Sequence, residues 1–221
     1  MSKCKFIELD TNFLQSIATD SDRVPSLYFS RYWPVRKGFW MRLRMIYWLL
    51  LRFQRVREKC LDFGGGGGVF LPTLSGLFKS VICIDLENKE AQKTIQEYGL
   101  DNVRLIQGDI TKGQISDAPF DAIVAADVLE HFKDLSSPID ALKRWLGSDG
   151  ILYTSLPTEN YIYTGLRKVF GVTKPWDHYH TGYEVEMCLE SHGFRKVESI
   201  SVPLYFKAFP LFLISVWRID R

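Results

Sequence analysis

The chain has little net charge, few cysteines and no long apolar run, and each shortage excludes a class of protein. Its 221 residues carry a formal net charge of only +2, which offers no broad electrostatic field for nucleic acid. The four cysteines are widely spaced and form no Cys-x-x-Cys pair, so nothing indicates a zinc or redox motif. The apolar stretch 209–217 is too short to cross the ~30 Å of a bilayer as a helix. We therefore expect no membrane span, and any basic surface for nucleic acid has to be local.

The N-terminus also lacks the pattern of an export signal. Its first ten residues contain Lys3, Lys5, Glu8 and Asp10 without an apolar core behind them, so we expect a cytoplasmic protein. With 46% hydrophobic residues, the chain is long enough for one well-buried domain and too short for two comfortable ones. The simplest division is an N-terminal helical extension or lid over residues 1–57 and one domain over 58–221.

Five consecutive glycines, residues 64–68, follow the apolar stretch 60–63. Side-chain-free backbone between a strand and a helix lets a ligand lie against the main chain. The dinucleotide fingerprint does not fit, because the glycine it requires at position i+5 falls on Val69 or later, and no Gly-Lys-Ser/Thr follows to make a P-loop. The pattern that fits is Asp-x-Gly-x-Gly-x-Gly, made by Asp62, Gly64, Gly66 and Gly68. Gly65 and Gly67 have no role in it.

This pattern resembles the first motif of class I S-adenosylmethionine-dependent methyltransferases, and three later features follow in that family's order. The apolar run 81–84 ends in Asp85, 17 residues beyond Gly68. Residues 103–107 lead into Gly108, Asp109 and Ile110, and the run 120–126 ends in the segment from Asp127 to His131. Within the family, the chain looks like the type 11-like group of small-molecule methyltransferases.

The resemblance implies S-adenosyl-L-methionine as the cofactor and assigns its contacts. Asp62 and the backbone of Gly64, Gly66 and Gly68 would hold the methionine part; Asp85, beside Leu86, would take the ribose; Asp109 and Ile110 would face the adenine. An acidic side chain at the tip of the second parallel strand can accept both ribose hydroxyls. Asp127 follows the fourth strand, where cofactor and acceptor meet in such folds.

Histidines provide the candidate catalytic groups. Methyl transfer from a sulfonium mainly requires alignment of the reacting atoms. If the acceptor is a hydroxyl, a base should assist the loss of its proton, and histidine suits neutral pH. His131 lies just past the fourth strand, where the alternative role is that of a structural turn residue. His178 and His180 follow the fifth strand in a segment that resembles the family's variable substrate-facing loop. A metal site formed by Asp177, His178 and His180 has no fourth ligand nearby, so we expect no metal.

Alternating β-branched runs and helical patterns from residue 59 onward predict an α/β fold. We expect a Rossmann-like three-layer sandwich whose seven-stranded, mostly parallel sheet ends in a C-terminal antiparallel hairpin. The predicted parallel strands are 59–63, 81–85, 103–107, 121–126 and 151–155, and the hairpin strands are 194–202 and 209–219. Predicted helices cover 87–98, 138–146 with Ser137 as the cap, and 181–192; Gly147 and Gly150 should separate the second helix from the next strand.

Residues 36–59 contain eight basic residues and one acidic residue, interleaved with aromatic and aliphatic side chains. The simplest interpretation is a first helix that packs on the sheet, with arginine stems along its rim. The composition is also typical of an interfacial helix on an anionic membrane, which predicts peripheral membrane contact through residues 36–57. Nucleic acid is a third and weaker alternative.

Taken together, the sequence predicts a methyltransferase that acts on a small-molecule or lipid-linked acceptor, with oxygen as the expected target atom. The aromatic and basic insertion 157–176 is expected to help form the acceptor pocket. The alternative is a catalytically silent member of the fold that binds cofactor or a partner protein. A nicotinamide oxidoreductase is disfavoured by the glycine register.

Overall fold

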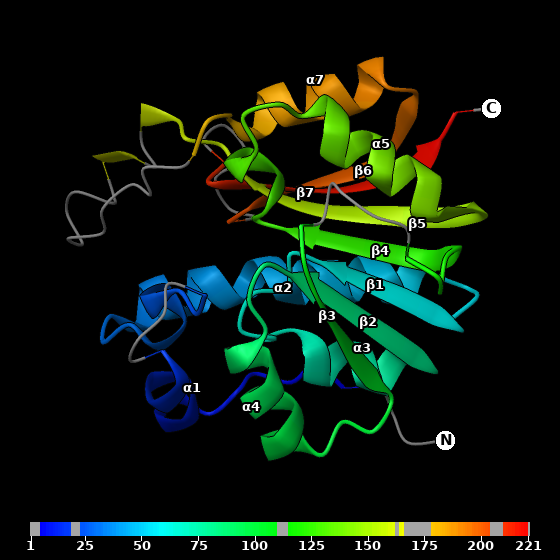
Figure 1. Ribbon diagram of the computed structural model, residues 1–221. Helices are drawn as coiled ribbons and strands as arrows, with labels where there is room; N and C mark the ends of the chain where they lie inside the picture. The colour runs from blue at the N-terminus through cyan, green and yellow to red at the C-terminus, as the bar shows by residue number, and fades with distance from the viewer. Residues whose placement is uncertain are drawn as a thin grey trace.

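A computed structural model describes residues 5–18, 23–109, 115–161, 164–165, 178–203 and 210–220. It contains a seven-stranded sheet in the order β3-β2-β1-β4-β5-β7-β6 (Figure 1). The strands are β1 (Lys59–Phe63), β2 (Ser80–Asp85), β3 (Val103–Gln107), β4 (Phe120–Ala126), β5 (Leu146–Pro157), β6 (Phe194–Val202) and β7 (Phe212–Ile219). The first five are parallel, and β7 pairs antiparallel with both β5 and β6. The predicted fold class is confirmed.

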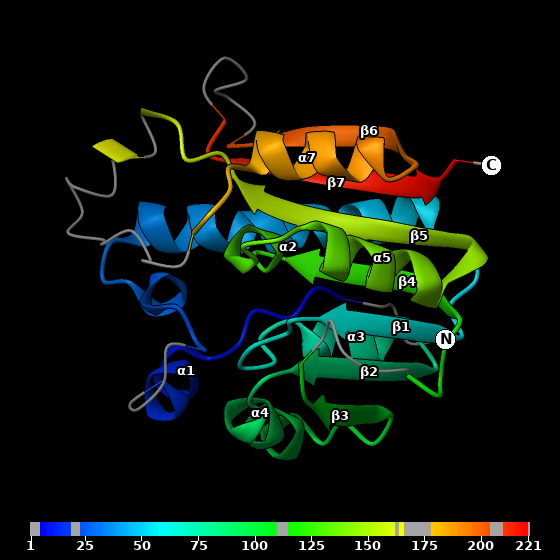
Figure 2. The ribbon, with the colours of Figure 1, turned by 45° about the horizontal axis from the view of Figure 1, so that its top comes forward.

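Helices cover both faces of the sheet. Apolar side chains of α1 (Thr11–Ile17), α2 (Trp33–Phe53), α3 (Leu71–Leu77) and α4 (Lys89–Tyr98) share one core cluster, whereas α5 (Ser136–Trp145) and α7 (Gly182–Ser191) belong to the other. Figure 2 shows α5 and α7 in front of the sheet and α2 behind it. Successive residues of β1 point to opposite faces of the sheet, so that Cys60 packs in the first cluster and Leu61 in the second. A strand buried on both faces reads as a continuous apolar run, which is why the sequence located it.

The boundary between α5 and β5 differs from the prediction. Helix α5 begins at Ser136, so Ser137 lies inside its first turn, and the N-cap residue Leu135 makes no side-chain hydrogen bond. Strand β5 begins directly after the helix, because Leu146 pairs with Phe120 of β4, and the strand therefore includes both Gly147 and Gly150. The predicted cap and the predicted glycine separator are wrong.

The basic segment forms α2, whose apolar side packs on the sheet. Leu43, Ile46, Leu49 and Leu50 are buried, and α2 contacts β5, β6 and β7. Acidic residues bind several of its cations: Glu8 pairs with Lys37 and Arg44, and Glu198 pairs with Arg52. These contacts agree with the packing interpretation of the segment. In the part of the chain that the structure describes, no helix is both long and apolar enough to cross a membrane.

Candidate functional site

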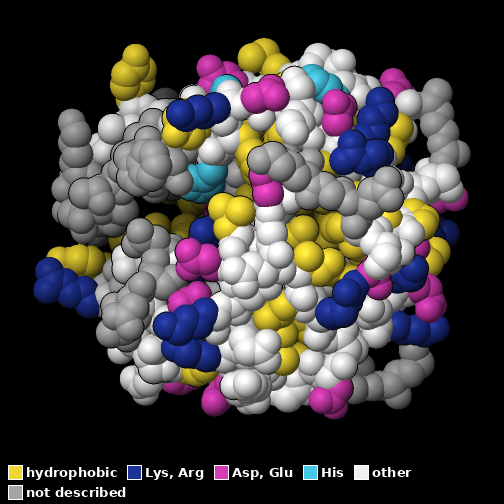
Figure 3. All heavy atoms as spheres, in the orientation of Figure 1, with side chains coloured by type: hydrophobic (Ala, Val, Ile, Leu, Met, Phe, Trp, Pro, Cys, Tyr) yellow, Lys and Arg dark blue, Asp and Glu magenta, His cyan; other side chains and the backbone are white. Residues whose placement is uncertain are grey.

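The predicted site residues gather where β1, β2 and β4 end. The sheet order reverses between β1 and β4, and ligands of open α/β sheets bind at the carboxyl ends of the strands beside such a switch point. Asp62 lies in β1, Asp85 ends β2, and Asp127 directly follows β4. In Figure 3, histidine, basic and hydrophobic side chains border a hollow on the left of the view. The topology thus places three acidic residues at one edge of the sheet.

The glycine loop has the alternation that the sequence indicates. Gly64, Gly66 and Gly68 have φ values of 72°, 54° and 72°, a region that side chains other than glycine rarely enter. The backbone N–H of Gly64 donates to the carbonyl of Ile84 at 2.8 Å, and the N–H of Gly66 donates to Oδ2 of Asp85 at 2.8 Å. The loop is therefore fixed to the end of β2.

Gly65 and Gly67 are explained by close contacts. A Cβ atom on Gly65 would lie 2.6 Å from both Oδ2 of Asp62 and Sγ of Cys83. A Cβ atom on Gly67 would lie 2.3 Å from Cγ2 of Val24. The sequence could not reveal these roles, since they depend on how the side chains of Asp62, Cys83 and Val24 pack against the loop.

Asp62 is a buried carboxyl group without a complete set of partners. It is 3% exposed, and its Oδ2 has no hydrogen-bond partner among the described residues. Burial, followed by the negative charge of Asp85, raises the pKa of Asp62 to about 7. A cationic ligand group beside Asp62 would favour its ionised form. A buried carboxyl group with a raised pKa in a ligand-binding position is typical of functional sites.

Residues of the N-terminal segment lie on the glycine loop. Nη1 of Arg23 is 3.1 Å from Oδ1 of Asp85, and the N–H of Gly67 donates to the carbonyl of Arg23 at 2.9 Å. Both carboxylate oxygens of Asp85 are therefore engaged, one by Arg23 and the other by the N–H of Gly66. Asp85 therefore lies at the end of β2 as predicted, but the guanidinium group of Arg23 binds one of its carboxylate oxygens.

Asp127 is held by both the sheet and α2. Its backbone is left-handed, with φ of 52°, and its N–H donates to the carbonyl of Ser155 at 2.8 Å. Oγ of Ser155 donates to Oδ1 of Asp127 at 2.9 Å, and Arg42 forms an ion pair with Oδ2. Nη2 of Arg42 also donates to Oη of Tyr28 at 2.7 Å. Helix α2 thus reaches the predicted acceptor side of the site through Arg42.

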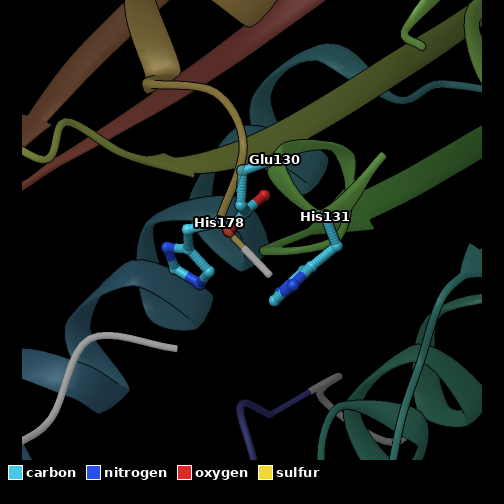
Figure 4. A group of neighbouring side chains, drawn as sticks. All are labelled: Glu130, His131 and His178. Atoms are coloured by element: carbon cyan, nitrogen blue, oxygen red, sulfur yellow. The ribbon is translucent and has the colours of Figure 1, made fainter. Parts of the chain in front are cut away.

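The structure brings His131 and His178 together (Figure 4). Their ring centroids are 4.7 Å apart at an interplanar angle of 86°. Nδ1 of His178 is 2.8 Å from Oε1 of Glu159, which has a left-handed backbone with φ of 51°. His180 does not join this pair, and its Nε2 lies 3.3 Å from the carbonyl oxygen of Lys133. Two of the three predicted histidines are neighbours.

Glu130 is the residue that the sequence interpretation missed. It lies in the short 3-10 helix η2 (Leu129–His131), is 0% exposed, and its ligand atoms fall within 4.8 Å of those of His131 and His178. Burial, followed by the charge of Asp127, holds the pKa of the Glu130 carboxyl well above its ordinary value. The available signal was a charged residue four positions after the buried strand β4 and next to the apolar Leu129.

The structure describes only some of the remaining predicted residues. Leu86 is 54% exposed beside Asp85, and Asp109 follows β3, partly buried. Ile110, most of the predicted insertion 157–176 and Asp177 lie outside the described residues. Their predicted roles therefore stay predictions.

Known proteins share this fold and part of this sequence. The family model described as "Methyltransferase domain" matches residues 61–154. A probable (S)-tetrahydroprotoberberine N-methyltransferase 2 of Papaver bracteatum is 30% identical over 101 residues, which cover 43% of this chain and 28% of that protein. The mitochondrial ubiquinone biosynthesis O-methyltransferase of Bos taurus is 29% identical over 164 residues, which cover 66% of this chain and 44% of that protein. The chain thus spans less than half the length of either relative.

Solved structures extend the likeness to nearly the whole chain. The magnesium protoporphyrin IX methyltransferase of Synechocystis PCC 6803, with bound S-adenosylhomocysteine, has a TM-score of 0.70 and 19% identity over 96% of this chain and 100% of that one. The N-methyltransferase NodS of Bradyrhizobium japonicum WM9 has a TM-score of 0.66 and 19% identity over 95% of this chain and 100% of that one. The resemblance seen in the sequence is confirmed: the chain has the fold of class I S-adenosylmethionine-dependent methyltransferases, and residues 61–154 match their methyltransferase domain family.

Proposed function

We propose that the chain is an S-adenosylmethionine-dependent methyltransferase with a small-molecule acceptor. The observation that carries this proposal is the cradle at the end of β2, where Asp85 accepts the N–H of Gly66 within a loop of left-handed glycines. The buried Asp62, whose Oδ2 has no partner among the described residues, fits a cationic amino acid group at the same place. The bound cofactor would supply a methyl group on a sulfonium, which is an excellent leaving group.

The proposed contacts of the cofactor follow the sequence prediction. Asp62 and the backbone of the glycine loop would hold its methionine part, and Asp85 with Leu86 would hold the ribose. Asp109 and Ile110 would face the adenine, and Asp127 would border the methyl group. The position of Asp62, Asp85 and Asp127 at one edge of the sheet supports this arrangement.

We propose oxygen as the methylated atom, because paired imidazoles can accept a hydroxyl proton near neutral pH. His131 and His178 are the candidate bases, and Glu159 orients His178 through Nδ1. His180 lies apart from this pair, so its catalytic role stays a prediction. The relatives in sequence include both N- and O-methyltransferases by name, so a nitrogen acceptor is the direct competitor. A lipid-linked molecule is a more specific choice of acceptor within the same proposal.

We further propose that residues 1–57 act as a lid on the domain formed by 58–221. Arg23 and Arg42 support this role, since they bind Asp85 and Asp127 from the N-terminal segment. Peripheral membrane contact through residues 36–57 stays a prediction; salt-sensitive flotation with anionic vesicles would support it, and absence of flotation would leave packing as the function of α2.

A catalytically silent protein is the second candidate. It is favoured by one observation, which is that Arg23 occupies the acidic tip where the ribose would bind. Arg23 must release Asp85, or share it, before a cofactor can use both carboxylate oxygens.

Titration with S-adenosylhomocysteine tests the cofactor site. We expect the wild type to bind, and Asp85→Ala to weaken binding by about 1.5–3 kcal/mol, the range for hydrogen bonds to a charged group. Asp140→Ala, an exposed position on α5, is the matched control and should leave the affinity unchanged. Equal affinities of wild type and Asp85→Ala would contradict the proposed ribose contact. Absence of binding to the wild type would contradict the proposed cofactor site.

A further inference from the structure

Three potential metal ligands converge beside the proposed acceptor side of the site. Glu130, His131 and His178 each offer one ligand atom, and these atoms lie within 4.8 Å of one another. Figure 4 shows the two imidazoles and the carboxyl group of Glu130 around a common space. Glu130 and His131 come from η2, whereas His178 comes from a segment 47 positions after His131. The fold therefore assembles a group that no local sequence motif contains.

The burial of Glu130 is the second, independent observation. The residue is 0% exposed, and neither of its carboxylate oxygens has a partner outside its own residue in the described part of the chain. A buried acidic group without a partner is costly unless a cation or a hydrogen-bond donor compensates it. The neighbouring charges are those of Asp127, Glu159 and Arg42, so acidic groups outnumber the basic one. An additional cation would balance this cluster.

The surroundings of His178 resemble those of a metal ligand. Its side chain is 7% exposed, and Nδ1 is 2.8 Å from Oε1 of Glu159, whose side chain is 5% exposed. Metal-bound histidines commonly donate their other N–H to a carboxylate, which fixes the tautomer and the orientation of the ring. With Nδ1 engaged by Glu159, Nε2 is the nitrogen that remains for an ion.

We propose that Glu130, His131 and His178 bind a divalent transition-metal ion. Two imidazoles and one carboxylate suit Zn²⁺ or a similar ion, whereas Mg²⁺ prefers oxygen ligands. Zinc–ligand bonds of ~2.1 Å place tetrahedral ligands about 3.4 Å apart, so binding draws the three side chains closer together. Three protein ligands leave a position open, as in catalytic zinc sites. If the proposed function holds, an acceptor hydroxyl can take that position, and the ion would then lower the pKa of the hydroxyl in place of a histidine base, because metal-bound imidazoles cannot accept a proton. Metal binding itself does not depend on that function.

From the sequence, Asp177, His178 and His180 form a set of neighbours without a fourth ligand, which predicts no metal. In the structure His178 instead pairs with His131 and Glu130, while His180 lies near Lys133.

The test is Zn²⁺ binding to the full chain after treatment with a chelator, measured by calorimetry and by metal content after dialysis. We expect about one equivalent in the wild type, at least tenfold weaker binding in Glu130→Gln and His178→Ala, and a loss of about 10–100-fold in Glu159→Gln. His180→Ala is the matched control and should bind like the wild type, and Mg²⁺ should not compete. Circular dichroism establishes that each variant is folded, and His131→Asn replaces Glu130→Gln if the latter does not fold.

Two results would overturn the proposal: no Zn²⁺ bound by the wild type, or equal binding by the wild type and the folded His178→Ala and His131→Asn variants. The latter result would indicate surface coordination. S-adenosylhomocysteine binding measured in the same samples separates this outcome from failure of the proposed function, because cofactor affinity reports Asp62 and Asp85 and not the metal ligands.

Discussion

Asp62 shows how one residue links stability to the proposed function. Its carboxyl group lies in a central strand and is almost fully buried, and burial together with Asp85 raises its pKa from an ordinary value of 3.8 to about 7. The folded chain therefore binds the Asp62 proton more tightly than the unfolded chain does. The stabilisation from this group is complete below about pH 4 and is lost as the pH rises through about 7.

We expect Asp62→Asn to be increasingly stabilised relative to the wild type between pH 5 and pH 8, because asparagine does not ionise. Urea unfolding at both pH values measures the difference. Asp140→Asn, at an exposed position on α5, is the control for the loss of one carboxylate. A difference for Asp62→Asn that stays constant would mean that Asp62 does not carry the raised pKa. The same variant should bind S-adenosylhomocysteine more weakly.

The residues that sequence reasoning could locate are those at strand ends. Asp62, Asp85 and Asp127 were placed correctly at one edge of the sheet, because a parallel sheet aligns the carboxyl ends of its strands. The contact of Glu130 with His178 joins positions 48 apart, and Glu159 reaches His178 through a left-handed backbone. A single sequence provides no signal for either contact. Their roles and those of the other site residues stay predictions until tested.

At the scale of elements, the glycine loop combines two different requirements. Gly64, Gly66 and Gly68 need their backbone conformation, whereas Gly65 is surrounded by Asp62 and Cys83. The alternation of the first three was visible in the sequence. The packing requirement was not, because it depends on how β1 and β2 lie beside the loop.

We expect Gly65→Ala to lower the free energy of unfolding by about 1–3 kcal/mol, the usual cost of overpacking. Gly76→Ala is the matched control, since Gly76 lies in α3 and its Cβ would have no atom within 4 Å. Alanine there should stabilise the helix by ~0.5–1 kcal/mol. Urea denaturation measures both variants. If both substitutions raise stability, the contacts assigned to Gly65 are not those of the folded protein.

Element boundaries were harder to predict than element types. All seven strands were expected near their places, because most of them are apolar or β-branched runs at ordinary spacing. The start of β5 was missed since it is determined by pairing of Leu146 with Phe120 and not by the nearby glycines. The N-terminus of α5 was missed because Ser137 follows, rather than precedes, the first helical residue.

At the scale of the whole molecule, the N-terminal segment and the sheet form one packed body. Leu14 and Ile46 share a core cluster with Val81 and Val124 of the central strands. The basic residues between 36 and 59 therefore border a helix whose apolar face is covered by the sheet. If the proposed lid opens, the change is expected at the contacts of Arg23 and Arg42 rather than in this core.

Methyl transfer by this body can be measured without knowing the acceptor. The purified chain is incubated with methyl-labelled S-adenosylmethionine and fractionated small molecules from a cell extract. We predict that the wild type moves label into at least one fraction and that Asp85→Ala moves much less, while Asp140→Ala behaves like the wild type. If the wild type labels no fraction more than heat-inactivated protein does, the claim of methyl transfer is contradicted.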